Sequence, residues 1–379
     1  MWLVRTVLSY LLTYRKSLLI ADQKEYIASI TGLILNVVSY LAIILLVTWE
    51  QNYLLALGIG TVTEVVLNIW ISWYVEQKYP FLRQRRKEKS TSSLTKRIVR
   101  DLKSLFISRI SEKMLYCTDN LIISGFIGVG TVGRYANYCM ITQAISNILT
   151  ILANTIQPTV GDYFTEKNRQ RNYEILRQLT FGFFCIASVV SVGLFSLITP
   201  FVRDIWLGPS YELGWGITVF CIVVLLVRIM GLPLSLVMGV TGLFEKEKNV
   251  GASSALLNLI VSLALVKPYG MAGVLLGTLL SYLLQILYRY IIYFRDFLEM
   301  PGEALRYAQD IGEYLAVIAG EVLLMQKIVP LIYGAGGMLL FCVCFLLCIA
   351  IPLLLDLVIF GRGWRLQSIV TMVKGMRKA

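Results

Sequence analysis

The sequence predicts an all-α protein that crosses a membrane many times, as a polytopic bundle of transmembrane helices. Of the 379 residues, 57% are hydrophobic and only 15% are charged, whereas soluble domains carry about 25% charged residues. Apolar runs of ~20 residues recur along most of the chain, and each is long enough to cross a hydrocarbon core of roughly 30 Å. Basic residues gather between these runs, as is typical of loops at the inner surface of a membrane.

We expect about ten full spans, preceded by one half-span. The spans at 103–126 and 132–156 are amphipathic, with polar groups on one face. In chain order, the expected spans are 1–13, 27–48, 53–75, 103–126, 132–156, 178–201, 214–238, 249–267, 270–293, 310–330 and 335–360.

The half-span is the run at the start of the sequence. Residues 2–13 would form a helix roughly 18 Å long, too short for a hydrocarbon core of ~30 Å. Met1 also lacks the charged region and cleavage site of a signal peptide. We therefore expect the sequence to begin in the middle of a membrane helix.

Charge predicts the orientation of the chain in the membrane. Residues 78–103 include ten Lys or Arg, which places this segment in the cytoplasm under the positive-inside rule. Alternation of the spans then places the basic loops around 15–24, 167–177, 246–248 and 295–306 inside, together with the C-terminal tail. The net charge of +12 is thus explained by a multi-pass protein of the cytoplasmic membrane, without a nucleic-acid partner.

The residue inventory argues against catalysis. The sequence contains no histidine, which removes the commonest general base and metal ligand. Its seven cysteines lie in apolar runs without a CxxC pair, which is typical of buried free thiols. No phosphate-cradling loop or metal-ligand cluster is present, so we expect no enzyme activity, no cofactor and no metal.

The segment 104–128 is the most informative. On a helix, one sector of about 120° gathers its polar side chains, while Ile110 and Met114 lie opposite. The sector comprises Arg109, Glu112, Lys113, Tyr116, Asp119 and Asn120. A charge at the centre of a membrane helix costs about 2.5–3.5 kcal/mol, so this sector either lines a watery cavity or forms an internal ion-pair network.

Other polar groups also fall within the expected spans. They are Glu64, Arg134, Gln143, Asn147, Asn154, Gln157, Arg228, Glu321 and Asp356. Because histidine is absent, a carboxylate is the natural carrier of a coupling proton or Na⁺, and the candidates are Glu64, Glu112 and Asp119. Arg134 and Arg228 suit phosphate oxygens. The alternatives are a helix-packing role for each carboxylate and snorkelling for each arginine.

A weak internal repeat relates two pairs of spans. Asn36 and Ser39 are followed by the dipeptide at 60–61, and Asn258 and Ser262 by Gly277 and Thr278, at an offset near 220 residues. Duplicated halves are common in transporters.

Four stretches carry a resemblance to a known family: YRKSLLIADQKEYI (14–27), KYPFL (78–82), TDNLIISGFIGVGTVGRYANY (118–138) and GMAGVLLGTLLS (270–281). They resemble the O-antigen and capsular polysaccharide flippases of the multidrug/oligosaccharidyl-lipid/polysaccharide exporter superfamily, and the similarity runs almost end to end. The multidrug and lipid II branches are less similar.

The resemblance implies two six-helix bundles followed by two extra helices. Residues 1–75 are then the remnant of the N-terminal bundle, with its first three helices missing. Residues 76–102 form a basic cytoplasmic loop, 103–293 a complete second bundle, and 310–379 the extra helices with a basic cytoplasmic tail.

The resemblance also implies a function in polysaccharide biosynthesis, with membrane lipid and polysaccharide-assembly proteins as partners. The protein would move a lipid-linked oligosaccharide, carried on undecaprenyl pyrophosphate, to the outer leaflet. Arg109, Lys113, Arg134 and Arg228 would hold the pyrophosphate, with Tyr116 and Asn120 beside them. The alternatives are a cation-coupled drug exporter of the same fold, and an inactive truncated fragment.

Overall fold

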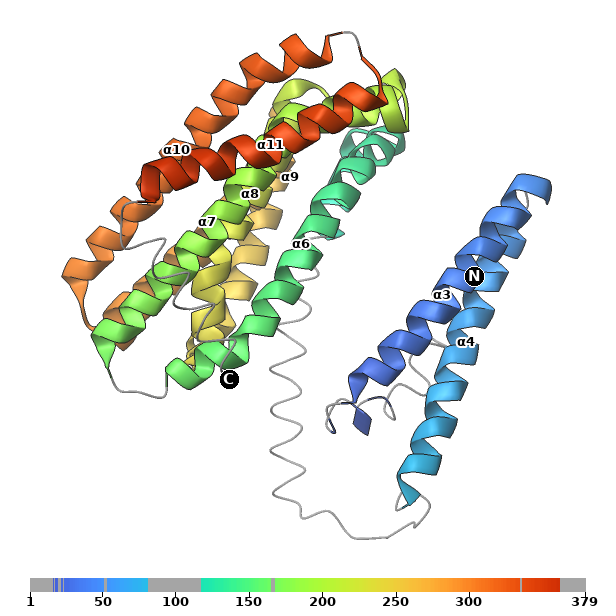
Figure 1. The fold of residues 1–379 in the computed structure, drawn as a ribbon, viewed down its shortest axis with the longest axis horizontal. Coiled ribbons are helices and arrows are strands. Elements are labelled where there is room, and N and C mark those ends of the chain that lie inside the picture. Colours follow the sequence, from blue (N-terminus) through green and yellow to red (C-terminus); the bar gives the residue numbers. More distant parts are fainter. Residues whose placement is uncertain are drawn as a thin grey trace. The chain divides into compact units, whose positions relative to one another are not determined.

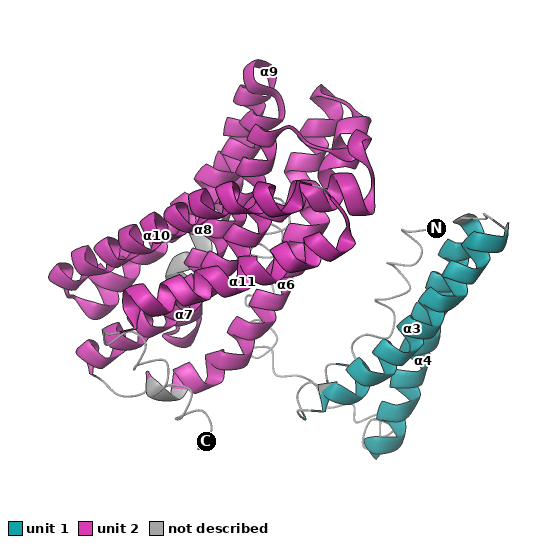
Figure 2. Cartoon of the chain, turned by 45° about the horizontal axis from the view of Figure 1, so that its top comes forward, with its two compact units in different colours: residues 1–95 teal, residues 96–379 magenta. Residues whose placement is uncertain are grey.

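The computed structural model describes residues 16, 18, 19, 22, 24–50, 53–80, 117–164, 168–334 and 336–361. Over these residues the regular secondary structure is entirely helical, which confirms the predicted all-α class. The chain forms two compact units, residues 1–95 and 96–379 (Figure 2).

The first unit contains two long helices, α3 (Glu25–Glu50) and α4 (Tyr53–Lys78). They pack as an antiparallel hairpin in which Gly32 faces Leu67. Leu19, Ala28, Ile71 and Val75 form its small buried cluster. Most other apolar side chains of both helices are exposed, as expected for helices that meet lipid.

Polar contacts join the two ends of this hairpin. The Tyr79 hydroxyl donates to Asp22 Oδ2 at 2.5 Å, and the Lys24 ammonium donates to the same oxygen at 2.5 Å. These hydrogen bonds, first from Lys24 and then from Tyr79, lower the pKa of the exposed Asp22 carboxyl below its usual value. The segment before α3 is thereby tied to the residue that follows α4.

The second unit holds the remaining helices (Figure 1). They are α6 (Val129–Tyr163), α7 (Arg169–Pro200), η2 (Phe201–Trp206), η3 (Pro209–Tyr211), α8 (Trp215–Val240), α9 (Phe244–Ile291), η4 (Ile292–Leu298), α10 (Pro301–Tyr333) and α11 (Met338–Phe360). A helical segment at 117–126 precedes α6. Helix α8 packs against α6, α7 and α9, while α10 and α11 pack against α7.

Helix α9 is a hairpin of two helices. Gly270 interrupts it with φ 58° and ψ −135°, a backbone conformation that glycine adopts without a Cβ penalty. Asn258 and Thr278, twenty residues apart, are hydrogen-bonded across the hairpin, whereas a straight helix would separate them by about 30 Å. The break confirms the separate spans expected at 249–267 and 270–293.

The interface of α7 with α10 and α11 has an aromatic layer. Phe184 stacks on Tyr314 with ring centroids 4.4 Å apart, and Phe360 of α11 meets both rings at 5.5 and 5.8 Å. Phe181 completes the group at 5.5 Å from Phe360. Buried aromatic pairs in edge and offset geometries add about 0.5–1.5 kcal/mol each beyond their burial, so this layer holds the last two helices on α7.

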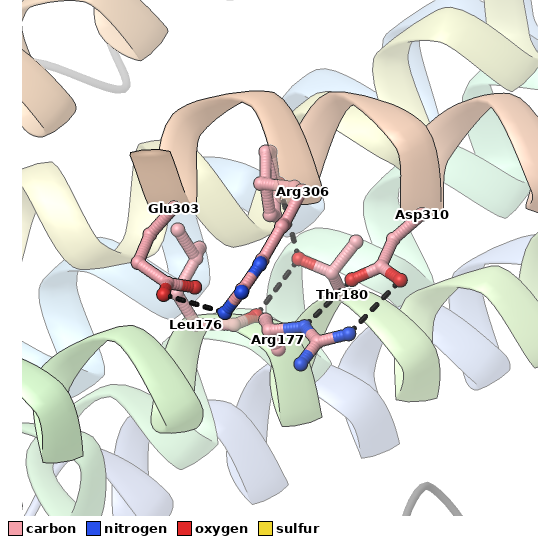
Figure 3. Close-up of polar contacts among 7 residues, drawn as sticks. Leu176, Arg177, Thr180, Glu303, Arg306 and Asp310 are labelled. Atoms are coloured by element: carbon pink, nitrogen blue, oxygen red, sulfur yellow. Dashed lines mark hydrogen bonds and ion pairs between the residues drawn. The ribbon is translucent and has the colours of Figure 1, made fainter. Parts of the chain in front are cut away.

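An ion pair fixes the register of α10 on α7 (Figure 3). Arg177 donates to Asp310 through Nε at 2.6 Å and through a terminal guanidinium nitrogen at 2.9 Å. One turn away, the Thr180 hydroxyl lies 3.1 Å from the Tyr307 hydroxyl. Glu303 and Arg306 pair along α10 at 2.9 Å. The bidentate geometry holds α7 and α10 in one relative position.

The described residues include eight candidate membrane spans by length and composition. One of them, Val250–Leu298, covers the expected span 270–293 and all but the first residue of the expected span 249–267. The expected spans 1–13 and 103–126 lie outside or largely outside the described residues. Basic residues assigned to loops by their charge, such as Arg177 and Arg306, instead lie within α7 and α10, because helices continue past the apolar runs that predict them.

Candidate functional site

The site centres on the Asp119 carboxylate. Asp119 lies on the helical segment 117–126, and its side chain is only 4% exposed. About nine residues, or roughly 13 Å of helix, separate it from the turn at Gly128. Asn258 and Thr278 of the α9 hairpin lie about 12–18 Å of helix from the turn at Gly270. If both turns lie at the outer surface, as the charge pattern predicts, the three side chains meet near the middle of the membrane.

The hydrogen bonds form a closed triangle. The Thr278 hydroxyl donates to Asp119 Oδ2 at 2.7 Å and accepts from the Asn258 amide at 2.9 Å. The same amide donates to Asp119 Oδ1 at 3.4 Å. Because a hydroxyl has one proton, its 3.4 Å approach to the Val274 carbonyl is the weaker contact. Each half of the α9 hairpin therefore supplies one donor to Asp119.

Close packing of the hairpin makes this triangle fit. At Gly277, a Cβ atom would lie 2.4 Å from Ser262 Oγ and 3.1 Å from the Asn258 carbonyl oxygen, and at Gly273 one would lie 2.3 Å from the Leu265 carbonyl oxygen. Glycines four residues apart let membrane helices approach closely. Ser262, which is fully buried, donates to the Val274 carbonyl at 3.3 Å.

The site is rich in oxygen and poor in positive charge. Within the described part of the chain, Asp119 forms no ion pair, and its partners are the two neutral donors. Asn258 Oδ1 is buried without a hydrogen-bond partner. Tyr135 and Cys139 of α6 and Cys221 of α8 are neighbouring titratable groups. A buried carboxylate with neutral oxygens around it suits a proton or a hard cation such as Na⁺.

The other predicted site residues are spread over the chain. Arg134 and Asn120 are exposed, and Arg228 is half-buried with its guanidinium 5.5 Å from the centre of the Tyr282 ring. Glu64 is half-buried on α4 of the first unit. Arg109, Glu112, Lys113 and Tyr116 lie outside the described residues. Of the predicted site residues that the structure describes, only Asp119 joins this hydrogen-bonded cluster.

Asn258 and Thr278 were not predicted as site residues. Both had been noted as members of the internal repeat, together with Ser262 and Gly277. Polar and small residues recurring within apolar spans are therefore the sequence signal that points to the α9 side of the site.

Comparisons with known proteins agree with this architecture. Residues 1–164 match the family model described as polysaccharide biosynthesis protein. The fold is similar to that of the lipid II flippase MurJ in an inward closed conformation, with a TM-score of 0.62 and 16% identity over 92% of this chain and 70% of that chain. No curated protein matches the sequence. The match over residues 1–164 supports the predicted resemblance to polysaccharide biosynthesis proteins, and the structural similarity shows that the fold is shared.

Proposed function

We propose that this protein is a flippase that moves a polyprenyl-pyrophosphate-linked oligosaccharide across the cytoplasmic membrane during polysaccharide biosynthesis. The observation that carries the proposal is the Asp119 cluster, set in a fold shared with a lipid II flippase. A carboxylate buried among two neutral donors, without a basic partner in the described residues, is costly unless it binds something positive. Asp119 is therefore the site at which a cation drives transport.

Coupling follows from the three helical segments that meet at Asp119. A cation bound to the Asp119 carboxylate occupies oxygen lone pairs that otherwise accept hydrogen bonds from Thr278 and Asn258. It also neutralises the negative charge that attracts these two donors. The packing of segment 117–126 against the α9 hairpin then differs between the loaded and empty states. A ligand shifts a conformational equilibrium only by its difference in affinity for the two states, and this cluster provides such a difference.

Basic side chains supply the substrate's counter-charge in this proposal. Guanidinium groups bind pyrophosphate oxygens in bidentate fashion, and Arg134 and Arg228 are the candidates within the described residues. Arg109 and Lys113 are the candidates outside them. Arg228 lies over the Tyr282 ring, a contact that helps to hold its position.

Transport can be tested by reconstitution. We would place the purified protein in vesicles with a fluorescent polyprenyl-pyrophosphate oligosaccharide, impose a Na⁺ or proton gradient, and follow accessibility to a membrane-impermeant quencher. Wild-type protein should expose the lipid in a gradient-dependent manner. Asp119→Asn should abolish the gradient dependence, whereas Glu313→Gln, on the exposed face of α10, should transport normally.

The outcomes separate the parts of the proposal. Gradient-driven transport by Asp119→Asn at the wild-type rate would remove Asp119 from coupling. Movement of a cationic drug in place of the lipid-linked oligosaccharide would identify a drug exporter. Loss of lipid binding in Arg228→Gln, at normal abundance in the membrane, would support the pyrophosphate role.

The orientation is part of this proposal, with the segment 78–103 and the C-terminus in the cytoplasm. A cysteine introduced at Ser92 should resist a membrane-impermeant thiol reagent in intact cells and react after permeabilisation. Rapid labelling in intact cells would show that this segment lies outside and that the proposed topology is inverted.

A further inference from the structure

A second pair of buried carboxyl groups lies away from the Asp119 cluster, on helices that the proposed mechanism does not use. Glu321 belongs to α10 and Asp356 to α11, and each is 3% exposed. Ser188 of α7 donates to Glu321 Oε2 at 2.6 Å and also lies beside Asp356. Glu321 and Asp356 are close enough for their charges to act on each other. Three helices thus bring two acids to one serine.

The two carboxyl groups have too few hydrogen-bond donors to be carboxylates. Glu321 Oε1 and both oxygens of Asp356 are buried without a hydrogen-bond partner among the residues that the structure describes. A carboxylate accepts up to about four hydrogen bonds, so two carboxylates call for many donors, and Ser188 offers one proton. A carboxyl group that carries a proton is itself a hydrogen-bond donor. Protonation therefore supplies a hydrogen bond to oxygens that have no donor when both groups are ionised.

Within the described residues, the pair is buried and has no cation in direct contact. The nearest basic residue along α10 is the exposed Lys327, about 9 Å from Glu321 by helix rise. The aromatic layer lies beside the pair, since Phe184 and Phe360 are one helical turn from Ser188 and Asp356 respectively. In the part of the chain that the structure describes, the Cys185 thiol of α7 lies near both acids, and it cannot carry a positive charge. The nearest cation along α7 is Arg177, about 16 Å away by helix rise and bound to Asp310.

Two like charges in such a place repel each other and lose their hydration. A shared or bound proton removes both penalties, as in other carboxyl pairs that share a site. An alkali-metal ion could take oxygen ligands from both carboxylates and from Ser188, but one such ion would leave one of the two negative charges unbalanced, whereas protons can neutralise both groups. The observations therefore favour a proton as the ligand.

We propose that Glu321 and Asp356 form a proton-binding site between α7, α10 and α11, in which at least one carboxyl group is protonated at neutral pH. The proton allows the carboxyl groups to hydrogen-bond to each other and to Ser188. Its release charges the interface and weakens the docking of α10 and α11 on α7. This site is separate from Asp119 and does not depend on the proposed transport function.

Infrared spectroscopy tests this site directly, because a protonated carboxyl group has a carbonyl stretch that a carboxylate lacks. The full chain would be purified in lipid nanodiscs and measured at neutral pH in H₂O and D₂O. We expect a protonated-carboxyl band that shifts in D₂O. The band should diminish in each of the single variants Glu321→Gln and Asp356→Asn. In the double variant, the part of the band that comes from this pair should be absent.

Two controls assign the band. Asp119→Asn removes any contribution of Asp119 to the band, and the part of the band that comes from Glu321 and Asp356 should remain. Glu313→Gln, on the exposed face of α10, should leave the band unchanged. In wild-type protein, raising the pH should remove the band before the helical circular dichroism is lost, a measurement that needs no variant.

Two results would overturn the proposal. One is a double variant whose band equals that of the wild type while the wild-type band does not change with pH. The other is a wild type without the band whose thermal stability depends on Na⁺ over choline and loses this dependence in the double variant. The second result would show an ionised pair holding a metal ion.

Discussion

The interface between α7 and α10 contains two polar contacts that are built in opposite ways. Arg177 meets Asp310, and Ser188 meets Glu321, in both cases across 133 residues of sequence. Within each helix the two contacts are eleven residues apart, which is about three turns and returns to the same helix face. One acid therefore has a full counter-ion, while the other shares a single hydroxyl with Asp356.

The difference teaches how depth governs polar packing in this protein. Arg177 retains 21% of its side-chain exposure and Asp310 10%, near the predicted cytoplasmic end of both helices. Arg177 also lies 5.6 Å from the centre of the Tyr173 ring. Glu321 and Asp356 lie farther along the helices, behind the aromatic layer, and have almost no exposure to water. Where water is near, the chain uses an ion pair, and where it is absent, neutral acids cost less.

Breaking the ion pair should have the largest effect. Asp310→Ala leaves the Arg177 guanidinium half-buried without its counter-ion, which should lower the free energy of unfolding by about 3 kcal/mol. Thermal unfolding in detergent would measure this loss. The double variant with Arg177→Leu should recover part of it, because both desolvation costs disappear. If Asp310→Ala alone were as stable as wild type, the Arg177–Asp310 ion pair would contribute no more to the free energy of unfolding than an ion pair exposed to water.

Removing the shared hydroxyl should have a moderate effect. Ser188→Ala deletes the donor to Glu321 and should cost about 1–2 kcal/mol of stability. Ser253→Ala is a matched control, since its hydroxyl bonds only the Val250 carbonyl within its own helix. The contrast between the two variants in the same unfolding assay isolates the inter-helix contact. Equal losses would contradict the role assigned to Ser188.

Neutralising the deep acids should have a small effect. Glu321→Gln and Asp356→Asn have nearly the shape of protonated carboxyl groups, so each should change stability by under about 1 kcal/mol, in contrast to Asp310→Ala. The same unfolding assay, run near neutral pH and again at alkaline pH, would also test the pH dependence. At alkaline pH the double variant should be more stable than wild type, because it keeps no acid at this interface that can become charged. A loss comparable to that of Asp310→Ala would place ionised carboxylates in the interface.

The exposed acid Asp22 should give the smallest effect. Its pKa is lowered in the folded state by Lys24 and Tyr79, so its stabilising contribution is present above the unfolded pKa of about 3.9. That contribution is lost as pH falls through the lowered folded pKa. Tyr79→Phe removes one donor and should raise the pKa of Asp22 toward its usual value, as followed by carbon NMR of the carboxyl. Tyr40→Phe, on the exposed face of α3, should leave it unchanged.

Sequence patterns predicted the helices well and the contacts between them poorly. Apolar runs located α8 and α11 to within about three residues at each end, because burial in lipid needs an apolar surface along the whole span. Helix α7 begins at residue 169, well before the apolar run expected to start at 178. Asp119 stood out because a carboxylate inside such a run is costly. Its partners did not, because asparagine and threonine are tolerated in membrane helices for many reasons. The Arg177–Asp310 pair was hidden by the assignment of Arg177 to a basic loop.

The pairing of Glu321 with Asp356 was beyond the reach of pattern reasoning for a geometric reason. Both residues were recognised as intramembrane polar groups, but their separation of 35 residues gives no phase relation between α10 and α11. Their contact depends on how both helices lie against Ser188 of a third helix. Such a three-body arrangement becomes visible only when the packing of all three helices is known.

The turn at Gly270 has a consequence for how the chain enters the membrane during synthesis. A continuous α9 of 48 residues would be about 72 Å long, more than twice the thickness of the hydrocarbon core. The left-handed conformation at Gly270 divides it into two segments joined by hardly any loop. The second segment therefore stays next to the first during synthesis, and we expect the insertion machinery to release the two segments into lipid together, as one hairpin. The Asp119 partners Asn258 and Thr278 would then already face each other before segment 117–126 packs against them.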